Sequence, residues 1–232
     1  MISIVIPVLN EASKIVRFLQ HLQPFREAGH ELILVDGGSH DGTPELAEDL
    51  VDQLVLTDAG RAHQMNQGAA LAKGDLLLFQ HVDTWLPDKA VTLLSSLEGE
   101  SVWGRFDVRL TPGHWMFPVI AHLMNYRSRL TGIATGDQSI FVSRELFVRV
   151  GGFPAQRLME DVELSGRLKR YADPLCLREK VLTSSRRWHH QGVWKTIFLM
   201  WRLRLAYFLG RSPEQLAAIY YPQLKSAPNK TH

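Results

Sequence analysis

The fold is decided by the stretch Asp75-Leu76-Leu77-Leu78-Phe79-Gln80-His81-Val82-Asp83-Thr84. Four consecutive apolar residues are too few for a helical core and are typical of a strand buried on both faces, as in a parallel sheet covered by helices. Because strand side chains alternate, Phe79, His81 and Asp83 are predicted to share one face. Open α/β sheets bind ligands at the carboxyl ends of their strands, so we expect a ligand site there. The alternative is that Asp83 only caps the following helix.

The composition is that of a folded globular protein. The chain has 232 residues, 45% of them hydrophobic and 22% charged, which allows a sizeable core. The single cysteine, Cys176, excludes an internal disulfide framework and fits a reducing compartment. No basic leader precedes the first motif, and no run reaches about 18 apolar residues, so neither a signal peptide nor a transmembrane helix is predicted. We expect one cytoplasmic domain over residues 1–232.

Charge is distributed unevenly along the chain. From Arg186 onward there are eight Lys or Arg residues against one acid, Glu214, which leaves 18 basic and 23 acidic residues upstream. Basic tails usually bind phosphate groups. For the residues beyond Arg211, a basic surface that only faces solvent is an equally good interpretation. No nucleic-acid-binding module is recognisable, so nucleic acid is not an expected partner.

The first half alternates strands with helices. Apolar strand patterns occur at 2–8, 31–36, 54–56 and 75–84, and helix patterns begin after Asn10-Glu11, at Thr43-Pro44 and at His63. This order predicts an α/β fold with a doubly wound, mostly parallel sheet flanked by helices. In the second half we expect strands at 102–110 and 140–142, helices within 114–130, 144–150 and from 159 onward, and a basic, apolar helical tail over 191–232.

Three strands of this predicted sheet end near a carboxylate: Glu11, Asp36 and Asp83. A carboxylate can accept hydrogen bonds from a base or ribose, or hold a divalent cation. The chain has neither Gly-x-Gly-x-x-Gly after its first strand nor a P-loop, which argues against a dinucleotide-dependent dehydrogenase and a P-loop protein.

Taken together, these features resemble the family 2 glycosyltransferases, which have the GT-A fold, and within them a small bacterial "transferase 2" subgroup. The matching stretches are Ile4–Glu11, Val35–Thr43, Gly60–Ala69, Gly74–Thr84, Gly136–Gln138 with Phe141, Gly151–Phe153 and Glu160–Leu164. They occur in the family's order and span roughly residues 2–190. The resemblance implies a nucleotide-sugar-binding half over 1–100 and an acceptor and catalytic half over 101–190.

The resemblance assigns the donor site residue by residue. Asp36 would accept from uracil or another base, with Pro7 and Glu11 lining the base and ribose pocket. Arg61 would stack on or neutralise the nucleotide. Asp83 matches the last Asp of the family's Asp-x-Asp signature, which holds Mg²⁺ or Mn²⁺ on the sugar diphosphate.

The signature departs from the family pattern at His81, which stands where the first Asp usually is. Imidazole suits Mn²⁺ better than Mg²⁺. His81 or His189 could therefore complete the ligands of a metal held by Asp83, although adjacent histidines such as His189 and His190 are more often plain surface.

Asp161 is the expected general base. On a helix it shares a stripe with Leu164 and Leu168 that continues to Tyr171, so its carboxylate should point inward. Glu160 lies almost as close to this stripe, and spacing does not choose between the two; in the family's Glu-Asp pair the Asp is the base. The alternative is a carboxylate that only stabilises the helix N-terminus.

Residues near the second half's end would contact diphosphate and acceptor. Arg186-Arg187-Trp188 resembles the family's Gln-x-x-Arg-Trp segment, with Ser184 in place of the Gln. The resemblance implies that Arg187 binds the diphosphate and that the acceptor packs on the ring of Trp188. It also implies that Gln138 contacts the diphosphate or the acceptor.

The most hydrophobic stretch is 193–209, with two tryptophans and three cations. Lys195 and Arg202 should lie together, with Arg204 and Arg211 nearly opposite, so no clean amphipathic helix is predicted. Two interpretations of 193–211 remain. This segment could contact the inner face of a membrane peripherally, or it could pack against a partner subunit or the chain's own domain.

The sequence thus predicts transfer of a sugar, with inversion as in the family, from a nucleotide-diphosphate sugar (UDP favoured) to a hydroxyl acceptor that is lipid- or polysaccharide-linked. One alternative is a sugar nucleotidyltransferase, which would need a glycine-rich basic loop where Pro7–Glu11 stands. The other is a non-catalytic carbohydrate- or lipid-binding module, favoured by His81 and the missing Gln.

Overall fold

The computed structural model describes residues 1–186, 188 and 192–220. Its strands are β1 (Ile2–Val8), β2 (Glu31–Asp36), β3 (Gln53–Leu56), β4 (Leu76–Phe79), β5 (Thr84–Trp85), β6 (Trp103–Leu110), β7 (Phe141–Ser143) and β8 (Leu175–Thr183). Its helices are α1 (Ala12–Glu27), α2 (Thr43–Ala47), α3 (Arg61–Leu71), α4 (Ala90–Ser95), α5 (Phe117–Thr131), α6 (Arg144–Arg149), α7 (Glu160–Leu168), α9 (Val193–Phe208) and α10 (Pro213–Tyr220), with short 3₁₀ turns η1 (Glu48–Leu50) and η2 (Gly136–Gln138).

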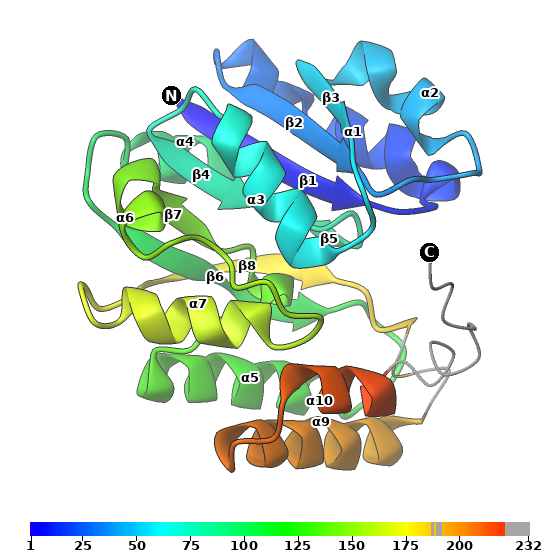
Figure 1. The fold of residues 1–232 in the computed structure, drawn as a ribbon, viewed down its shortest axis with the longest axis vertical. Coiled ribbons are helices and arrows are strands. Elements are labelled where there is room, and N and C mark those ends of the chain that lie inside the picture. Colours follow the sequence, from blue (N-terminus) through cyan, green and yellow to red (C-terminus); the bar gives the residue numbers. More distant parts are fainter. Residues whose placement is uncertain (187, 189–191, 221–232) are drawn as a thin grey trace, which may run out of the picture.

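All eight strands form one sheet in the order β3-β2-β1-β4-β7-β6-β8-β5 (Figure 1). The strands β3, β2, β1 and β4 are parallel, which confirms the doubly wound first half. β7 is antiparallel to both β4 and β6, so β6 again runs in the direction of β4. The carboxyl ends of β1, β2, β4 and β6 therefore lie at the same edge of the sheet.

Helices cover both faces of this sheet. On one face, α1 buries Ile15, Phe18 and Leu22 against the strands, together with α2 and α4. On the other face, α3, α6 and α7 pack over Val5, Val35, Leu77 and Phe79. The alternation of buried side chains along β1 supplies both cores, as expected for a strand without a solvent-exposed face. The helices α9 and α10 lie beyond α5 at one end of the molecule (Figure 1).

One expected local detail is wrong. β4 ends at Phe79, and residues 80–83 form a turn before β5, because the carbonyl of His81 accepts the amide hydrogen of Thr84. His81 and Asp83 therefore do not alternate along a strand face. The helix expected after Asn10-Glu11 is present, because α1 starts at Ala12. Asn10 itself has a left-handed backbone (φ 54°). The helix start expected at Thr43 is also present, as the first residue of α2, and the hydroxyl of Thr43 donates to Asp41.

No helix within the part of the chain that the structure describes is both long enough and apolar enough to cross a bilayer.

The close contact between α3 and the sheet depends on a glycine. A Cβ placed on Gly68 would lie 2.4 Å from Cγ1 of Val5 and 3.0 Å from Cγ2 of Val35. Both valines are fully buried and β-branched, so neither can move aside easily.

We therefore expect Gly68→Ala to lower the free energy of unfolding by about 1–3 kcal/mol through overpacking. Gly166→Ala in α7 is the matched control, because a Cβ there meets nothing within 4 Å. The control should gain up to about 1 kcal/mol from helix propensity. Urea unfolding of both variants measures the difference, and equal stabilisation by both would contradict this account of the packing.

Candidate active site

The carboxyl ends of β1 and β2 are held together by one buried amide. Gln64 on α3 donates from Nε2 to the carbonyls of Val8 and Val35, both at 2.8 Å. The amide of Gly37 also donates to the carbonyl of Val8, at 2.9 Å. Gln64 lies within a stretch that the family resemblance had marked, but its spacing gave no reason to assign it this role. These bonds fix the position of Asp36, which ends β2.

Asp36 is buried but only half satisfied. Its Oδ1 accepts the amide hydrogens of Gly38 at 2.8 Å and Ser39 at 2.7 Å. Its Oδ2 is buried and has no hydrogen-bond partner among the described residues. A buried acceptor without a partner is costly, so this oxygen is suited to a donor group brought by a ligand.

Pro7 and Glu11, the residues expected to line the base and ribose pocket, lie on the neighbouring strand β1 and at the start of α1. Pro7 is partly buried and pairs in register with Val35 on β2. Glu11 stands at the start of α1, where its carboxylate lies 2.5 Å from the ammonium of Lys14 and its amide donates to the hydroxyl of Thr43. The two residues border the Asp36 loop, although Glu11 already has a cationic partner.

His81, Gly136, Glu160 and Asp161 meet in a small pocket of about 10 Å³ between the end of β4, η2 and the start of α7. The pocket is closed on its other sides by Met65, Phe79, Ile140 and Phe153. A Cβ on Gly136 would lie 2.4 Å from Cε1 of His81, so only glycine lets the ring approach. Burial, followed by the charge of Arg61, lowers the pKa of His81 to about 3, and the imidazole is neutral at pH 7.

Glu160, the first residue of α7, is the more deeply buried of the two adjacent acids. Only 3% of it is exposed, and its Oε1 lies 3.3 Å from Nε of Arg61. Burial raises the pKa of Glu160, and the charge of Asp161 raises it further, whereas Arg61 acts in the opposite direction. Arg61, the expected nucleotide ligand, is thus paired with Glu160.

Asp161 is oriented by backbone hydrogen bonds. Its Oδ2 accepts the amide hydrogen of Gly136 and its Oδ1 that of Val162, both at 2.8 Å. The inward stripe of α7 is present at Leu164 and Leu168, but Tyr171 lies beyond the end of the helix and is exposed. Asp161 is partly buried and lines the pocket, and these two hydrogen bonds fix the orientation of its carboxylate.

Arg127 on α5 was not predicted from the sequence. Its Nε and Nη2 are buried and have no hydrogen-bond partner among the described residues. Burial lowers the pKa of Arg127, the nearby charge of Asp161 raises it, and Arg105 lowers it further. A desolvated guanidinium beside the expected base could bind an anionic group of a substrate. Its position on a mostly exposed helix gave no sequence signal.

Asp83 does not line the small pocket. It lies in the turn after β4, partly buried, and its carbonyl accepts the amide hydrogen of Ser184 at 3.0 Å. Across residues 1–186, 188 and 192–220, no group of three or more His, Cys, Asp or Glu side chains is arranged to hold a metal ion. Any metal held by Asp83 would therefore need ligands beyond a cluster of these side chains.

The residues expected to contact the diphosphate and the acceptor do not line the small pocket or lie outside the described residues. Gln138 is buried, its Oε1 accepts the amide of Thr135 at 3.2 Å, and its Nε2 is buried without a partner in the described part of the chain. Trp188 is partly buried and packs against a cluster built on Leu110 and Phe117. Arg187 and His189 lie outside the described residues.

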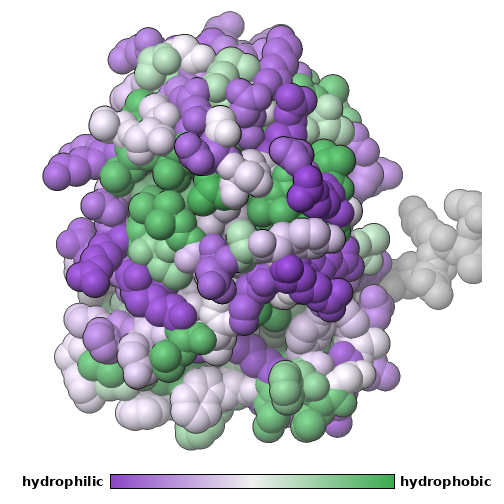
Figure 2. Space-filling model, turned by 90° about the vertical axis from the view of Figure 1, so that its left-hand side faces the viewer, coloured by the Kyte–Doolittle hydropathy of each residue, from purple (hydrophilic) through white to green (hydrophobic). Residues whose placement is uncertain are grey.

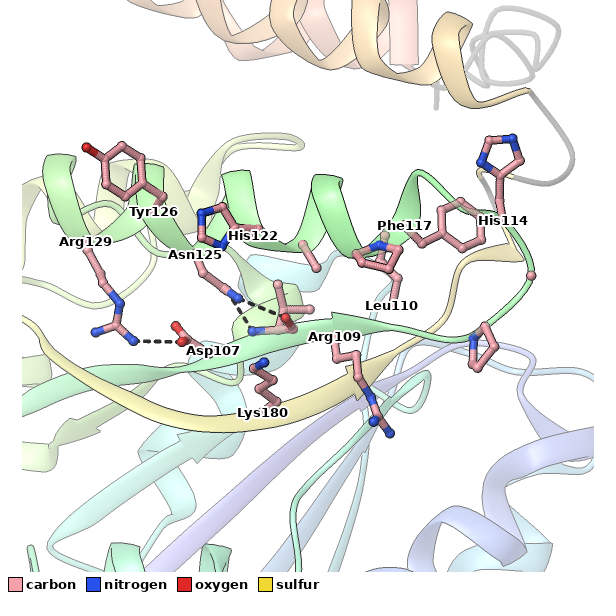
Figure 3. A pocket seen from close by; sticks show the side chains of 15 residues that line it. Asp107, Arg109, Leu110, His114, Phe117, His122, Asn125, Tyr126, Arg129 and Lys180 are labelled. Carbon is pink, nitrogen blue, oxygen red and sulfur yellow. Dashed lines mark hydrogen bonds and ion pairs between the residues drawn. The ribbon is translucent and has the colours of Figure 1, made fainter.

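A second, larger cleft of about 660 Å³ lies between β6, β8 and α5 (Figure 3). Figure 3 shows Arg129 paired with Asp107, at 2.7 Å, and Asn125 bonded to the backbone of β6. Successive helix residues are about 100° apart, so Arg127 projects nearly opposite Asn125. The two hollows share no lining residue.

Known proteins support the sequence-based assignment. The model of the glycosyl transferase family 2 matches residues 3–151, well over half of the chain. A PGL/p-HBAD biosynthesis glycosyltransferase of Mycobacterium bovis is 30% identical over 166 residues, which cover 66% of this chain and 63% of that protein. An undecaprenyl-phosphate 4-deoxy-4-formamido-L-arabinose transferase of Aeromonas hydrophila is 28% identical over 151 residues, 59% of this chain and 46% of that protein.

The chain thus spans less than two thirds of the length of these relatives. Among solved structures, a mannosyltransferase of Pyrobaculum calidifontis in complex with GDP-Man and Mn²⁺ has a TM-score of 0.66 at 20% identity, covering 96% of this chain and 70% of that one. The glucosyl-3-phosphoglycerate synthase of Mycobacterium tuberculosis, in complex with Mg²⁺ and UDP, has a TM-score of 0.58 at 20% identity, covering 79% and 70%. The fold is confirmed as that of the GT-A glycosyltransferases, and the chain belongs to glycosyl transferase family 2.

Proposed function

We propose that the chain transfers a sugar from a nucleotide-diphosphate sugar to the hydroxyl of an acceptor. The observation that carries this proposal is the ion pair between Arg61 from the first half and Glu160 from the second, where Glu160 and Asp161 line the pocket at the end of β4. Solved relatives of the same fold are described with UDP and with GDP-Man, which supports a nucleotide sugar as donor. UDP is the donor nucleotide that we favour.

In this proposal the donor's base and ribose lie over Pro7, Glu11 and Asp36. The free Oδ2 of Asp36 would accept a hydrogen bond from the base, because Oδ1 is already held by two backbone amides. Gln138 and Arg187 are the proposed contacts to the diphosphate, and Trp188 the proposed contact to the acceptor.

Asp161 is the proposed general base. It would take the proton of the acceptor hydroxyl while that oxygen bonds to the anomeric carbon and the bond from this carbon to the diphosphate oxygen breaks. The leaving nucleoside diphosphate keeps the electron pair, and attack opposite the leaving group inverts the anomeric carbon. The carboxylate of Glu160 is buried and paired with Arg61, whereas Asp161 is only partly buried and lines the pocket, which favours Asp161 for this role.

A divalent cation is part of the proposal. The carboxylate of Asp83 is a ligand of the kind that Mg²⁺ and Mn²⁺ prefer, and the neutral imidazole of His81 also has the protonation state that a ligand needs. A cation bound there would neutralise charge on the leaving diphosphate. Solved structures of the same fold hold Mn²⁺ or Mg²⁺.

A lipid-linked acceptor is supported by the name of one relative, the undecaprenyl-phosphate transferase of Aeromonas hydrophila. The proposed location is the cytoplasm or the inner face of a membrane.

Asp161→Asn should reduce turnover by about 10² or more, because a general base contributes about 10²–10⁴ in rate. Release of nucleoside diphosphate from a panel of nucleotide sugars, with and without added acceptors, is the measurement. Glu163→Gln on the same helix is the control, because Glu163 pairs with Arg167 away from the pocket. Normal turnover by Asp161→Asn would remove its role as base, and turnover by neither wild type nor control would favour a non-catalytic binding module.

Asp36→Asn should weaken nucleotide binding about tenfold or more, because hydrogen bonds to charged groups contribute about 1.5–3 kcal/mol. Titration calorimetry with UDP and with GDP measures the change. The exposed Asp88 provides the control variant Asp88→Asn, which should bind as wild type does. Equal affinities for all three proteins would show that the base does not lie on Asp36.

Asp83→Ala should abolish any gain in nucleotide affinity that Mn²⁺ gives the wild-type protein. The same titration, carried out with Mn²⁺ and with a chelator, tests this directly. A gain that survives in the variant would place the metal on other ligands.

A further inference from the structure

The helix α9 exposes a continuous row of large apolar side chains. The row, which we name the α9 stripe, consists of Trp194, Phe198, Trp201, Leu205 and Phe208. These residues are 60–87% exposed. Their spacing alternates between four and three, so they lie on one side of the helix within about 40° of a common line. Figure 2 shows hydrophobic side chains at the lower end of the molecule, the end that α9 and α10 form in Figure 1.

The α9 stripe is not the side of the helix that packs onto the protein. The opposite side carries Thr196 and Leu203, both buried, and Leu203 belongs to a cluster with Leu158, Met159 and Leu216. α9 therefore already has a core-facing side, and the stripe is additional apolar surface. Such a contiguous exposed patch is unusual on a soluble surface and marks a place of interaction.

The charges of α9 border the stripe. Lys195 and Arg202 lie about 80–100° to one side of its line, and Arg204 lies about 80° to the other. No Asp or Glu occurs within Val193–Phe208. From sequence alone, cations on opposite sides argued against an amphipathic helix. In the structure these cations flank the apolar α9 stripe on its two sides.

We propose that the α9 stripe docks α9 onto an anionic lipid surface, parallel to the plane of the membrane. Tryptophan, phenylalanine and leucine would enter the headgroup boundary, while lysine and arginine meet lipid phosphates, which is the arrangement of interfacial helices. A second copy of the chain is a poorer occupant, because two stripes face to face would bring Lys195, Arg202 and Arg204 together without a compensating acid on the helix. This inference does not depend on the glycosyl-transfer chemistry.

The test is co-sedimentation of the full chain with vesicles of phosphatidylcholine alone and of phosphatidylcholine with phosphatidylglycerol. We expect binding to the anionic vesicles, weakened by added salt, and little binding to the neutral ones. Two stripe variants are compared with wild type: an apolar variant, Phe198→Ser with Trp201→Ser, and a charge variant, Lys195→Glu with Arg202→Glu. Each variant should weaken vesicle binding about tenfold or more. The charge variant reverses two cations, each of which contributes about fivefold near an anionic surface. The apolar variant removes two large side chains that would enter the headgroup boundary.

The matched control replaces two equally exposed apolar residues elsewhere, Leu56→Ser with Val148→Ser, which are 69% and 70% exposed. It should bind vesicles as wild type does, and all variants should unfold at the wild-type temperature because none of the changed residues is buried. Unchanged vesicle binding by both stripe variants would overturn the proposal. So would a wild-type dimer in light scattering that the apolar variant abolishes, since that would assign the stripe to a second copy.

Discussion

The arrangement of the site depends on the attachment of α3 to the second half of the chain. Arg61 at the start of α3 pairs with buried Glu160 on α7. One turn further along α3, Asn66 exchanges two hydrogen bonds with the backbone of Phe153, at 2.8 and 2.9 Å. An ion pair with one buried partner adds little net stability because of the cost of desolvation, but it fixes geometry. These contacts accompany the placement of the first turn of α7, with both acids, beside the end of β4.

The electrostatics of this junction separate two adjacent acids. Glu160 is buried beside Arg61, and its pKa is raised because loss of water outweighs the attraction of the cation. Asp161 instead has two backbone amides and lies near the charge of Arg127, which is itself desolvated. Two carboxylates joined by one peptide bond thus have different environments, a condition under which neighbouring acids can take different roles. Gly136 contributes twice, because its amide holds Asp161 and its missing side chain admits His81.

Gly136 also illustrates why sequence patterns did not predict which side chains meet in the site. The motif order identified Gly136, Glu160 and Asp161 as members of a family signature, but periodicity does not tell that the ring of His81 stacks into the space beside Gly136. The alternation of a strand was extended through His81 to Asp83, yet β4 stops at Phe79 because the carbonyl of His81 closes a turn with Thr84. Arg127 carries no local signal, because its neighbours on α5 are largely exposed.

The sequence by itself determined the alternation of strands and helices in the first half and the parallel arrangement of its strands, because buried strands need continuous apolar runs. It also determined the family, through motifs kept in order. Only the tertiary structure decided that β7 runs against its neighbours, that Glu160 rather than Asp161 is the deeply buried acid, and that the apolar side of α9 faces outward. Those outcomes depend on which surfaces meet across long sequence separations, and helical spacing alone does not tell a packed side from an exposed one.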